Sequence, residues 1–259
     1  MRQVRTPVAG ESPHRLLRRG AVLGIALVAV VGLVTGCEEI PGQQSAGGAG
    51  TDVTTPDLTV TGDDAAAAAA AAAGTKPASA LGSVALLTVK GRAPKTGYTR
   101  DQFGPAWQDV DHNGCDTRND VLRRDLTEVV ATPGTHDCVV TSGVLADPYS
   151  GRTITFTRGQ DTSSAVQIDH VVALSDAWQK GAQQWDAGRR AALGNDPLNL
   201  LAADGPLNAQ KGDGDTATWL PPNKAIRCAY AVRFAQVSIK YQLPVTTADK
   251  SAMLKECGG

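Results

Sequence analysis

The sequence predicts an α+β domain at residues 84–259, which follows a long segment that cannot build a hydrophobic core. The first observation is composition, because residues 38–83 consist largely of small and polar residues and include an unbroken alanine run at 65–73. The second is pattern, because the later residues mix amphipathic helical spacing with short apolar runs that are typical of strands. The third is length, since about 176 residues are enough for one sizeable core.

Residues 1–36 are expected to be an export signal. Arginines, among them Arg18-Arg19, precede an apolar run at 21–34, and small residues mark the end of that run. The boundary Thr35-Gly36-Cys37 resembles a bacterial lipobox, in which the cysteine becomes the lipidated first residue of the mature protein. A short uncleaved transmembrane anchor is the alternative. We expect an exported protein, either lipid-anchored at Cys37 on the outer face of the cytoplasmic membrane or secreted.

Residues 37–83 are then expected to be a disordered tether, because their composition buries too little apolar surface to order the chain. The absence of any run of about 20 apolar residues excludes a multi-pass membrane protein.

Basic and acidic side chains balance within residues 84–259. That balance argues against a protein that holds polyanions by bulk charge, although a local basic groove is compatible with it.

The remaining cysteines predict two disulfides, because an even number in an exported chain is typical of disulfide pairing. They are Cys115, Cys138, Cys228 and Cys257. Three pairings can be drawn, and the local ones, Cys115–Cys138 and Cys228–Cys257, are favoured. A zinc site is the rival interpretation, but the chain has no Cys-x-x-Cys pair.

In the first half of the domain, short helices are expected at residues 99–110 and 117–129. The second has Val121, Leu122 and Leu126 at helical spacing. Strands are expected at 138–145 and 153–157, because Asp-Pro-Tyr-Ser-Gly at 147–151 between them is typical of a hairpin turn.

In the second half, a strand–helix–strand–helix unit is expected, followed by two helices capped by Asn223 and Thr247. The elements are, in order, 166–168, 173–193, 199–202, 205–211, 223–241 and 247–257. The first of these strands leads directly into Asp169-His170.

The residues best suited to chemistry lie in this unit. Asp169 and His170 are adjacent at a strand end, so their side chains diverge. Asn208 follows Asn199 across a predicted strand, turn and helix, a path that can return it to the neighbourhood of Asp169. A carboxylate and a carboxamide suit a hard cation such as Mg²⁺, which retains waters and takes phosphate oxygens. A histidine, with an ordinary pKa of about 6.5, suits removal of a proton from water.

With Lys211 added, this pattern resembles the HNH endonucleases, whose fold is the ββα-metal core. It is similar in particular to a secreted bacterial branch related to the nuclease part of GmrSD-type restriction enzymes. The core of the resemblance covers about residues 150–215, within a proposed nuclease domain at 84–259, and a looser resemblance runs from Tyr98 to the C-terminus.

The resemblance implies a role for each residue of the pattern. His170 is the general base, Asp169 and Asn208 are the metal ligands, Asn199 orients the base, and Lys211 contacts the substrate phosphate. Asn208 stands where the family often has a histidine, which favours Mg²⁺, with Mn²⁺ as the alternative, over zinc. Water activated by the base would attack phosphorus in line and leave a 5′ phosphate. The long interval between His170 and Asn199 is expected to contain an inserted helix.

A second pattern, upstream, mimics a calcium-binding loop. Its oxygen-bearing side chains are Asp109, Asp111, Asn113 and Asp120. Asp replaces the usual bidentate Glu, and Cys115 stands where the backbone ligand belongs, so a capped turn pinned by Cys115 is favoured over a calcium site. Arg118 in the same segment is a candidate for a second phosphate contact.

Two functions follow from the sequence. The first is an extracytoplasmic, metal-dependent endonuclease that cuts DNA, with RNA as a second substrate class and with no obligate protein partner. Low sequence specificity is expected because the chain shows no separate element for reading bases. The second is a non-catalytic lipoprotein of the cell envelope that uses a nuclease-like fold for binding.

Overall fold

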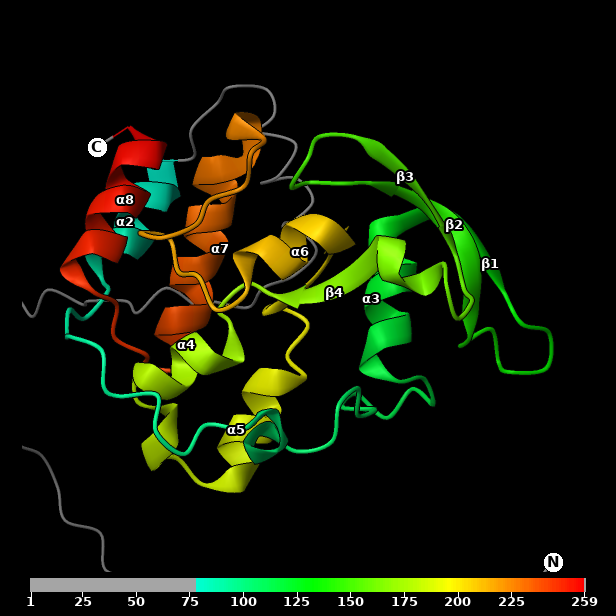
Figure 1. Ribbon diagram of the computed structural model, residues 1–259, viewed down its shortest axis with the longest axis horizontal. Helices are drawn as coiled ribbons and strands as arrows, with labels where there is room; N and C mark the ends of the chain where they lie inside the picture. The colour runs from blue at the N-terminus through cyan, green and yellow to red at the C-terminus, as the bar shows by residue number, and fades with distance from the viewer. Residues whose placement is uncertain (1–77, 259) are drawn as a thin grey trace, which may run out of the picture. The chain divides into compact units, whose positions relative to one another are not determined.

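The structure, a computed structural model, describes residues 78–258 (Figure 1). The predicted export signal, Cys37 and the tether up to residue 77 lie outside these residues. Helix α2 spans Ala78–Ala85, so the last residues assigned to the tether are helical, and Val84 packs into the core. Within the described part of the chain, no helix combines the length and the apolar character needed to cross a membrane.

The strands of residues 78–258 form two separate antiparallel sheets, as expected for an α+β domain. The larger sheet has the order β1-β2-β3, with β1 at Leu126–Ala131, β2 at Val140–Ala146 and β3 at Thr153–Thr157. The smaller sheet pairs β4 at Val166–His170 with β5 at Leu200–Asp204. In its register Ile168 pairs with Ala202 and His170 pairs with Leu200.

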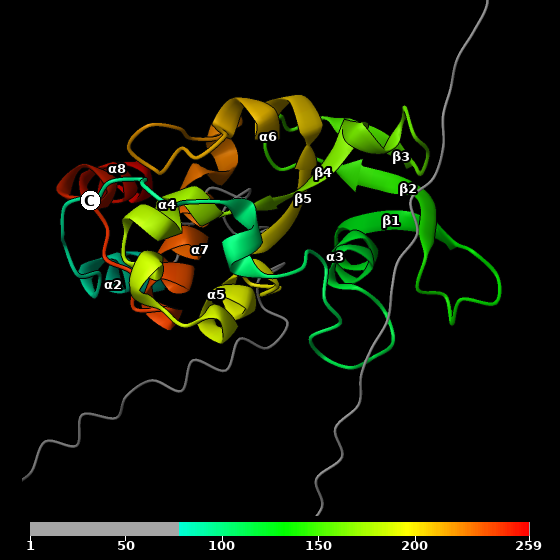
Figure 2. The same ribbon diagram turned by 60° about the horizontal axis from the view of Figure 1, so that its bottom comes forward.

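Helix α6 lies beside the smaller sheet (Figure 2), and α3 also contacts both of its strands. Besides α2, the described helices are η1 Arg100–Phe103, α3 Thr117–Asp125, η2 Ser163–Ala165, α4 Leu174–Gln179, η3 Ala182–Gln184, α5 Ala187–Gly194, α6 Gly205–Lys211, η4 Lys224–Ile226, α7 Arg227–Lys240 and α8 Thr247–Cys257. The Asp204 side chain caps α6 by accepting a hydrogen bond from the backbone N–H of Leu207. Because α6 follows β5 directly and contacts both strands, β4, β5 and α6 make a ββα unit.

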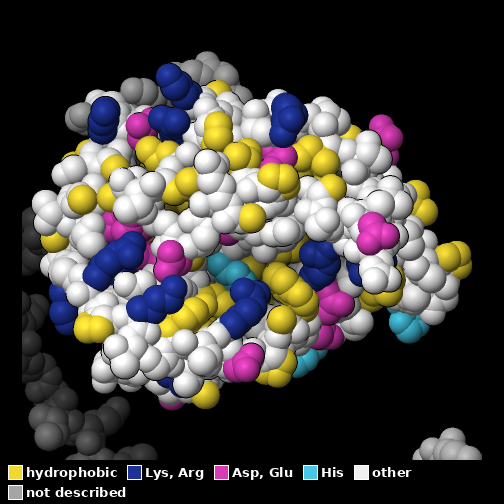
Figure 3. Space-filling model, viewed as in Figure 1, with side chains coloured by type: hydrophobic (Ala, Val, Ile, Leu, Met, Phe, Trp, Pro, Cys, Tyr) yellow, Lys and Arg dark blue, Asp and Glu magenta, His cyan; other side chains and the backbone are white. Residues whose placement is uncertain are grey.

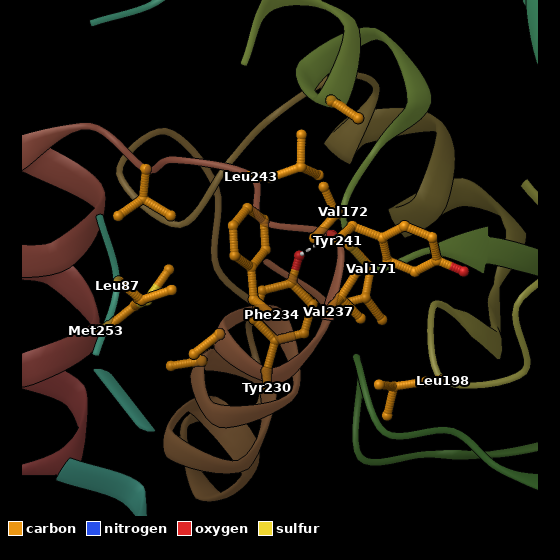
Figure 4. Packing of buried hydrophobic residues seen from close by; sticks show 14 of the residues in the cluster. Leu87, Val171, Val172, Leu198, Tyr230, Phe234, Val237, Tyr241, Leu243 and Met253 are labelled. Carbon is orange, nitrogen blue, oxygen red and sulfur yellow. Dashed lines mark hydrogen bonds between the residues drawn. The ribbon is translucent and has the colours of Figure 1, made fainter. Parts of the chain in front are cut away.

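Two hydrophobic cores lie on opposite faces of the β4–β5 ribbon. Ile168 and Ala202 belong to the smaller core, which α3 and the three-stranded sheet complete. Ala203, one residue further along β5, belongs to the larger core of the helical part. Figure 4 shows that core around Phe234 and Tyr230 of α7. The end of β4 therefore lies where the two cores meet.

Three predicted helices are shorter than the pattern indicated. The expected helix at 99–110 is only η1, because Gly104 has a φ of 75° and Pro105 disfavours helical backbone before it. The expected helix at 117–129 ends at Asp125, and the β-branched residues that follow pair with β2.

The expected helix at 173–193 is divided into α4, η3 and α5. Gly181, with a φ of 126°, ends the first part, and Asp186 caps the last by accepting from the backbone N–H of Arg189. The long interval between His170 and Asn199 thus contains two α-helices rather than one inserted helix.

Both predicted disulfides are present with the local pairing. Cys115–Cys138 joins the segment before α3 to the segment before β2, and Cys228–Cys257 joins α7 to α8. Each typically adds about 2–4 kcal/mol of stability by restricting the unfolded chain.

A buried ion network holds the helical part together. The Lys180 ammonium lies 2.9 Å from Asp176, 2.8 Å from Asp249 and 3.4 Å from Asp215. The Arg92 guanidinium bridges Asp176 and Asp215 from the N-terminal side. Burial raises the pKa of Asp176 to about 6, although Lys180 acts in the opposite direction. The network joins α4, α8 and the segment after α6.

Replacing Lys180 by methionine is expected to lower the free energy of unfolding by about 3–5 kcal/mol, because three buried carboxylates lose their central cation. Urea unfolding of the full chain measures this. Lys255→Met, which removes an exposed lysine of α8, is the control and should stay within about 0.5 kcal/mol of the parent. Equal midpoints for both variants would show that the network contributes nothing.

Candidate active site

A cavity of about 450 Å³ opens at the end of β4. Figure 3 shows a histidine at the centre of this face of the molecule, with Lys and Arg side chains on both sides of it. Three residues of the predicted pattern, Asp169, His170 and Asn208, line the cavity together. Tyr98 and Arg100, which come from the N-terminal side of the chain, also line it.

Asp169 is buried and held by ionic and hydrogen-bonding contacts to both of its carboxylate oxygens. The Lys211 ammonium lies 2.9 Å from its Oδ1 and 2.8 Å from its Oδ2, and the Tyr149 hydroxyl donates to Oδ2 at 2.5 Å. Lys211 also donates to the backbone carbonyl of His170 at 2.6 Å. The carboxylate is therefore fixed in position and its charge is balanced by a lysine on α6.

His170 points to the other side of the ribbon, as the alternation along a strand requires. Its Nε2 lies 2.9 Å from the carbonyl oxygen of Gly194, which can only accept, so Nε2 carries the proton. Its ring stacks on Trp107, with centroids 6.2 Å apart. Burial lowers the pKa of His170 to about 4, although the bond to Gly194 acts in the opposite direction. The imidazole is thus neutral at neutral pH, and Nδ1 keeps its lone pair.

Asn199 fixes two backbone segments, the one that follows this histidine and the one that carries its hydrogen-bond partner. Its Oδ1 accepts from the backbone N–H of Val172 at 2.8 Å, and its Nδ2 donates to the carbonyls of Val172 and Leu193. Val172 follows the histidine closely, and Leu193 precedes Gly194, the partner of the imidazole. The completely buried Asn199 side chain therefore positions both the strand end and the carbonyl that orients the ring.

Asn208, on α6, is half-buried and donates from Nδ2 to Oε1 of Gln167 at 2.9 Å. Its carboxamide and the Asp169 carboxylate are oxygen donors on the cavity surface that suit a hard cation, and the Asp213 carboxylate, which is paired with Lys95, lines the cavity as well. A carboxylate offers about four lone-pair directions, and Lys211 and Tyr149 use three of those on Asp169. One lone-pair direction remains on Oδ1 of Asp169. Asp169 and Asn208 together therefore fit a cation that keeps most of its water ligands.

A metal bound mainly by protein side chains does not fit. No group of three or more His, Cys, Asp or Glu residues is arranged to hold a metal ion within residues 78–258. The donor set is therefore poor for zinc, which takes nitrogen and sulfur ligands.

The two predicted phosphate contacts lie in different surroundings. Lys211 has a fully buried side chain whose ammonium contacts the Asp169 carboxylate and the carbonyl of His170, so it acts as a counter-ion. Arg118, on α3, does not line the cavity. Burial, together with the neighbouring charge of Arg158, lowers the pKa of Arg118.

The calcium-like loop is closed by its own hydrogen bonds. The Asn113 side chain donates to Asp111 and Asp120 and accepts from the backbone N–H of Cys115, while Asp109 accepts from Gly114. Burial raises the pKa of Asp120, and the neighbouring carboxylates add to the effect. This geometry is that of the capped turn, joined by Cys115 to Cys138.

Sequence reasoning missed several residues of the site, among them Tyr149, Trp107 and Arg100. Tyr149 reaches Asp169 because the hairpin turn docks on the ribbon: Asp147 accepts from the backbone N–H of Asp204 at 2.9 Å, and Asn223 donates to the carbonyl of Pro148. The turn itself was visible as Asp-Pro-Tyr-Ser-Gly, but no local pattern shows where a turn will dock. Trp107 comes from a segment that was predicted to be helical.

Comparisons with known proteins show the family of the chain. Residues 116–256 match the family described as "GmrSD restriction endonucleases, C-terminal domain". An uncharacterized secreted protein of the fungus Arthroderma benhamiae is 40% identical over 176 residues, which cover 66% of this chain and 81% of the relative. Because this relative is fungal, the bacterial branch stays a prediction.

The matched range contains β4, β5 and α6 together with every residue of the Asp169-His170, Asn199, Asn208 and Lys211 pattern. It leaves out the N-terminal residues that line the cavity. The match covers more than half of the chain, and the ββα unit is the element that the resemblance required. The chain belongs to the family of GmrSD restriction endonuclease C-terminal domains.

Proposed function

We propose that this protein is an exported, metal-dependent HNH endonuclease that hydrolyses phosphodiester bonds of DNA with low sequence specificity. The observation that carries the proposal is His170. Its Nε2 is bound to the Gly194 carbonyl and its Nδ1 lone pair is available at neutral pH, beside Asp169 and Asn208 in one cavity.

The roles of the side chains follow from their contacts. His170 accepts a proton at Nδ1 from the attacking water, and Asn199 keeps the imidazole in place through the backbone on both sides. Asp169 and Asn208 would hold a hydrated divalent cation, Mg²⁺ or Mn²⁺, which would stabilise the charge that develops on the phosphate and the leaving oxygen. Lys211 pairs with the Asp169 carboxylate and fixes its position.

Export is supported by three observations of different kinds. The two disulfides are typical of oxidising compartments, the relative from Arthroderma benhamiae is described as secreted, and residues 1–36 have the pattern of an export signal. Lipid attachment at Cys37 is the finer part of this proposal. DNA is proposed as the substrate because the family is one of restriction endonucleases, with RNA as a second substrate class.

The test is cleavage of supercoiled plasmid by the full chain with intact disulfides, in the presence of Mg²⁺, Mn²⁺, Ca²⁺ or EDTA. We expect nicking with Mg²⁺ or Mn²⁺ that EDTA abolishes. No cleavage of DNA or RNA with any metal, from a folded protein, would contradict the proposal and favour a non-catalytic binding protein.

His170→Ala is expected to lower the cleavage rate by about 10²–10⁴-fold, because the reaction loses its general base. The rate is measured by single-turnover nicking of plasmid. The matched control is His136→Ala, which removes an exposed histidine outside the cavity and should cut like the parent. Equal rates for the two variants would remove His170 from the mechanism.

Tyr149→Phe is expected to lower the free energy of unfolding by about 1.5–3 kcal/mol, because a buried carboxylate loses a hydrogen bond. Tyr230→Phe is the matched control, since its hydroxyl donates to the neutral carbonyl of Val171, and about 0.5–1.5 kcal/mol is expected. Guanidinium unfolding measures both. A larger loss for Tyr230→Phe would contradict the special role of the bond to Asp169.

A further inference from the structure

The active-site cavity has a second side that lies outside the region matching the family. Residues 116–256 match the family, yet Lys95, Tyr98 and Arg100 line the same cavity as His170 and Asn208. These residues belong to residues 92–107, which we call the N-terminal segment. The segment contributes no residue to the HNH pattern, so its presence at the cavity needs its own explanation.

The N-terminal segment is held firmly against the domain. Arg92 joins the buried ion network, and the backbone N–H of Ala93 donates to the carbonyl of Gln179 at 2.7 Å. The Trp178 indole donates to the carbonyl of Thr96 at 3.2 Å, and Phe103 is buried in the larger core. At the far end, the Trp107 ring stacks on His170. The segment is therefore a fixed side of the cavity.

The charges on the cavity surface leave one cation in excess. Both carboxylates that line the cavity are paired with lysines: Asp169 with Lys211 behind it, and Asp213 with Lys95 at 2.9 Å. The remaining charged residue is Arg100, which is exposed and has no ion pair or hydrogen bond from its side chain within residues 78–258. The surface of the cavity therefore presents a guanidinium that no acidic residue compensates.

Arg100 is also close to the reacting position. Arg100 and His170 line the cavity at the end of β4 together, and both also line a smaller adjoining pocket with Trp107 and Gly194. A guanidinium presents N–H groups in a planar fork that matches two oxygens of a phosphate. An unpaired arginine beside a general base in a cavity of this size is therefore suited to bind an anionic phosphodiester.

We propose that Arg100 binds a backbone phosphate of the nucleic-acid strand in the cavity, and that the N-terminal segment is thus part of the substrate site. This inference rests on the proposed nuclease function and adds to it a substrate-binding residue outside the matched family region. The contact is with the sugar–phosphate backbone, so it contributes affinity and register rather than base selection.

The test measures DNA affinity in the full chain carrying His170→Ala, which prevents cleavage. A labelled duplex is titrated at several salt concentrations with and without Arg100→Ala. We expect the Kd to rise about tenfold and the slope of log K against log salt to fall by about 0.9, the value for one lost phosphate contact. Arg100→Lys should keep the slope, since its charge is retained, while losing part of the affinity.

The matched control is Arg123→Ala, which removes the same charge from an exposed position on α3 that does not line the cavity. In the catalytically intact protein, Arg100→Ala should raise the KM for plasmid cleavage more than it lowers kcat. Thermal unfolding should be the same for all these variants.

The outcomes separate this inference from the function on which it rests. If the parent binds and cuts DNA but Arg100→Ala behaves like Arg123→Ala in affinity and salt slope, the assignment of Arg100 is wrong and the nuclease function stands. A loss of kcat without loss of affinity would also overturn the assignment. If the parent neither binds nor cuts nucleic acid, both proposals fail.

Discussion

The buried ion pair between Asp169 and Lys211 is the contact on which the geometry of the site depends. An unpaired carboxylate at this depth would carry a desolvation cost of several kcal/mol, so its position requires a cation within reach. Lys211 supplies that charge from α6 and also holds the carbonyl of His170, which ties the helix to the end of β4. Tyr149, in the turn between β2 and β3, donates to the same carboxylate and so connects it to the three-stranded sheet. One carboxylate thus joins three parts of the domain.

His170, the proposed general base, is also held in place by contacts to the backbone. His170 needs no acidic partner, because a carbonyl fixes its tautomer and burial keeps it neutral. Asn199 in turn holds the segments that carry the base and that carbonyl. Such preorganisation means that no rearrangement of the imidazole is required when water is activated.

Much of this arrangement could be predicted from local sequence. The ββα unit and the extent of α6 follow from patterns within a few residues, such as the run that leads into Asp169-His170, and the disulfides follow from the even number of cysteines. The extent of α8 was also predicted, although its cap is Thr246 rather than the expected Thr247. The direction of the two adjacent side chains follows from strand alternation alone. Local pattern sufficed wherever the determining contact was local.

The remainder depended on contacts between distant residues. The helix expected at 117–129 gives way to β1 because Leu126 and Thr127 find partners on β2, which no helical periodicity could show. The sequence around Lys211 is that of an ordinary solvated lysine. In the structure its side chain is buried, because it pairs with the Asp169 carboxylate. Trp107 reaches His170 only through the docking of a segment whose own sequence carries no signal for it.

The N-terminal segment also determines the order in which the site can be assembled. Its fixing contacts reach forward along the chain: Arg92 to Asp215, Lys95 to Asp213 and Thr96 to Trp178 span 123, 118 and 82 residues. Contacts at such separation require the intervening chain to be ordered first, because closing a long loop is entropically unfavourable. The N-terminal segment is therefore synthesised early but is among the last parts of the domain to dock. A chain that is still emerging, or that lacks its later helices, has the pattern residues without a closed cavity.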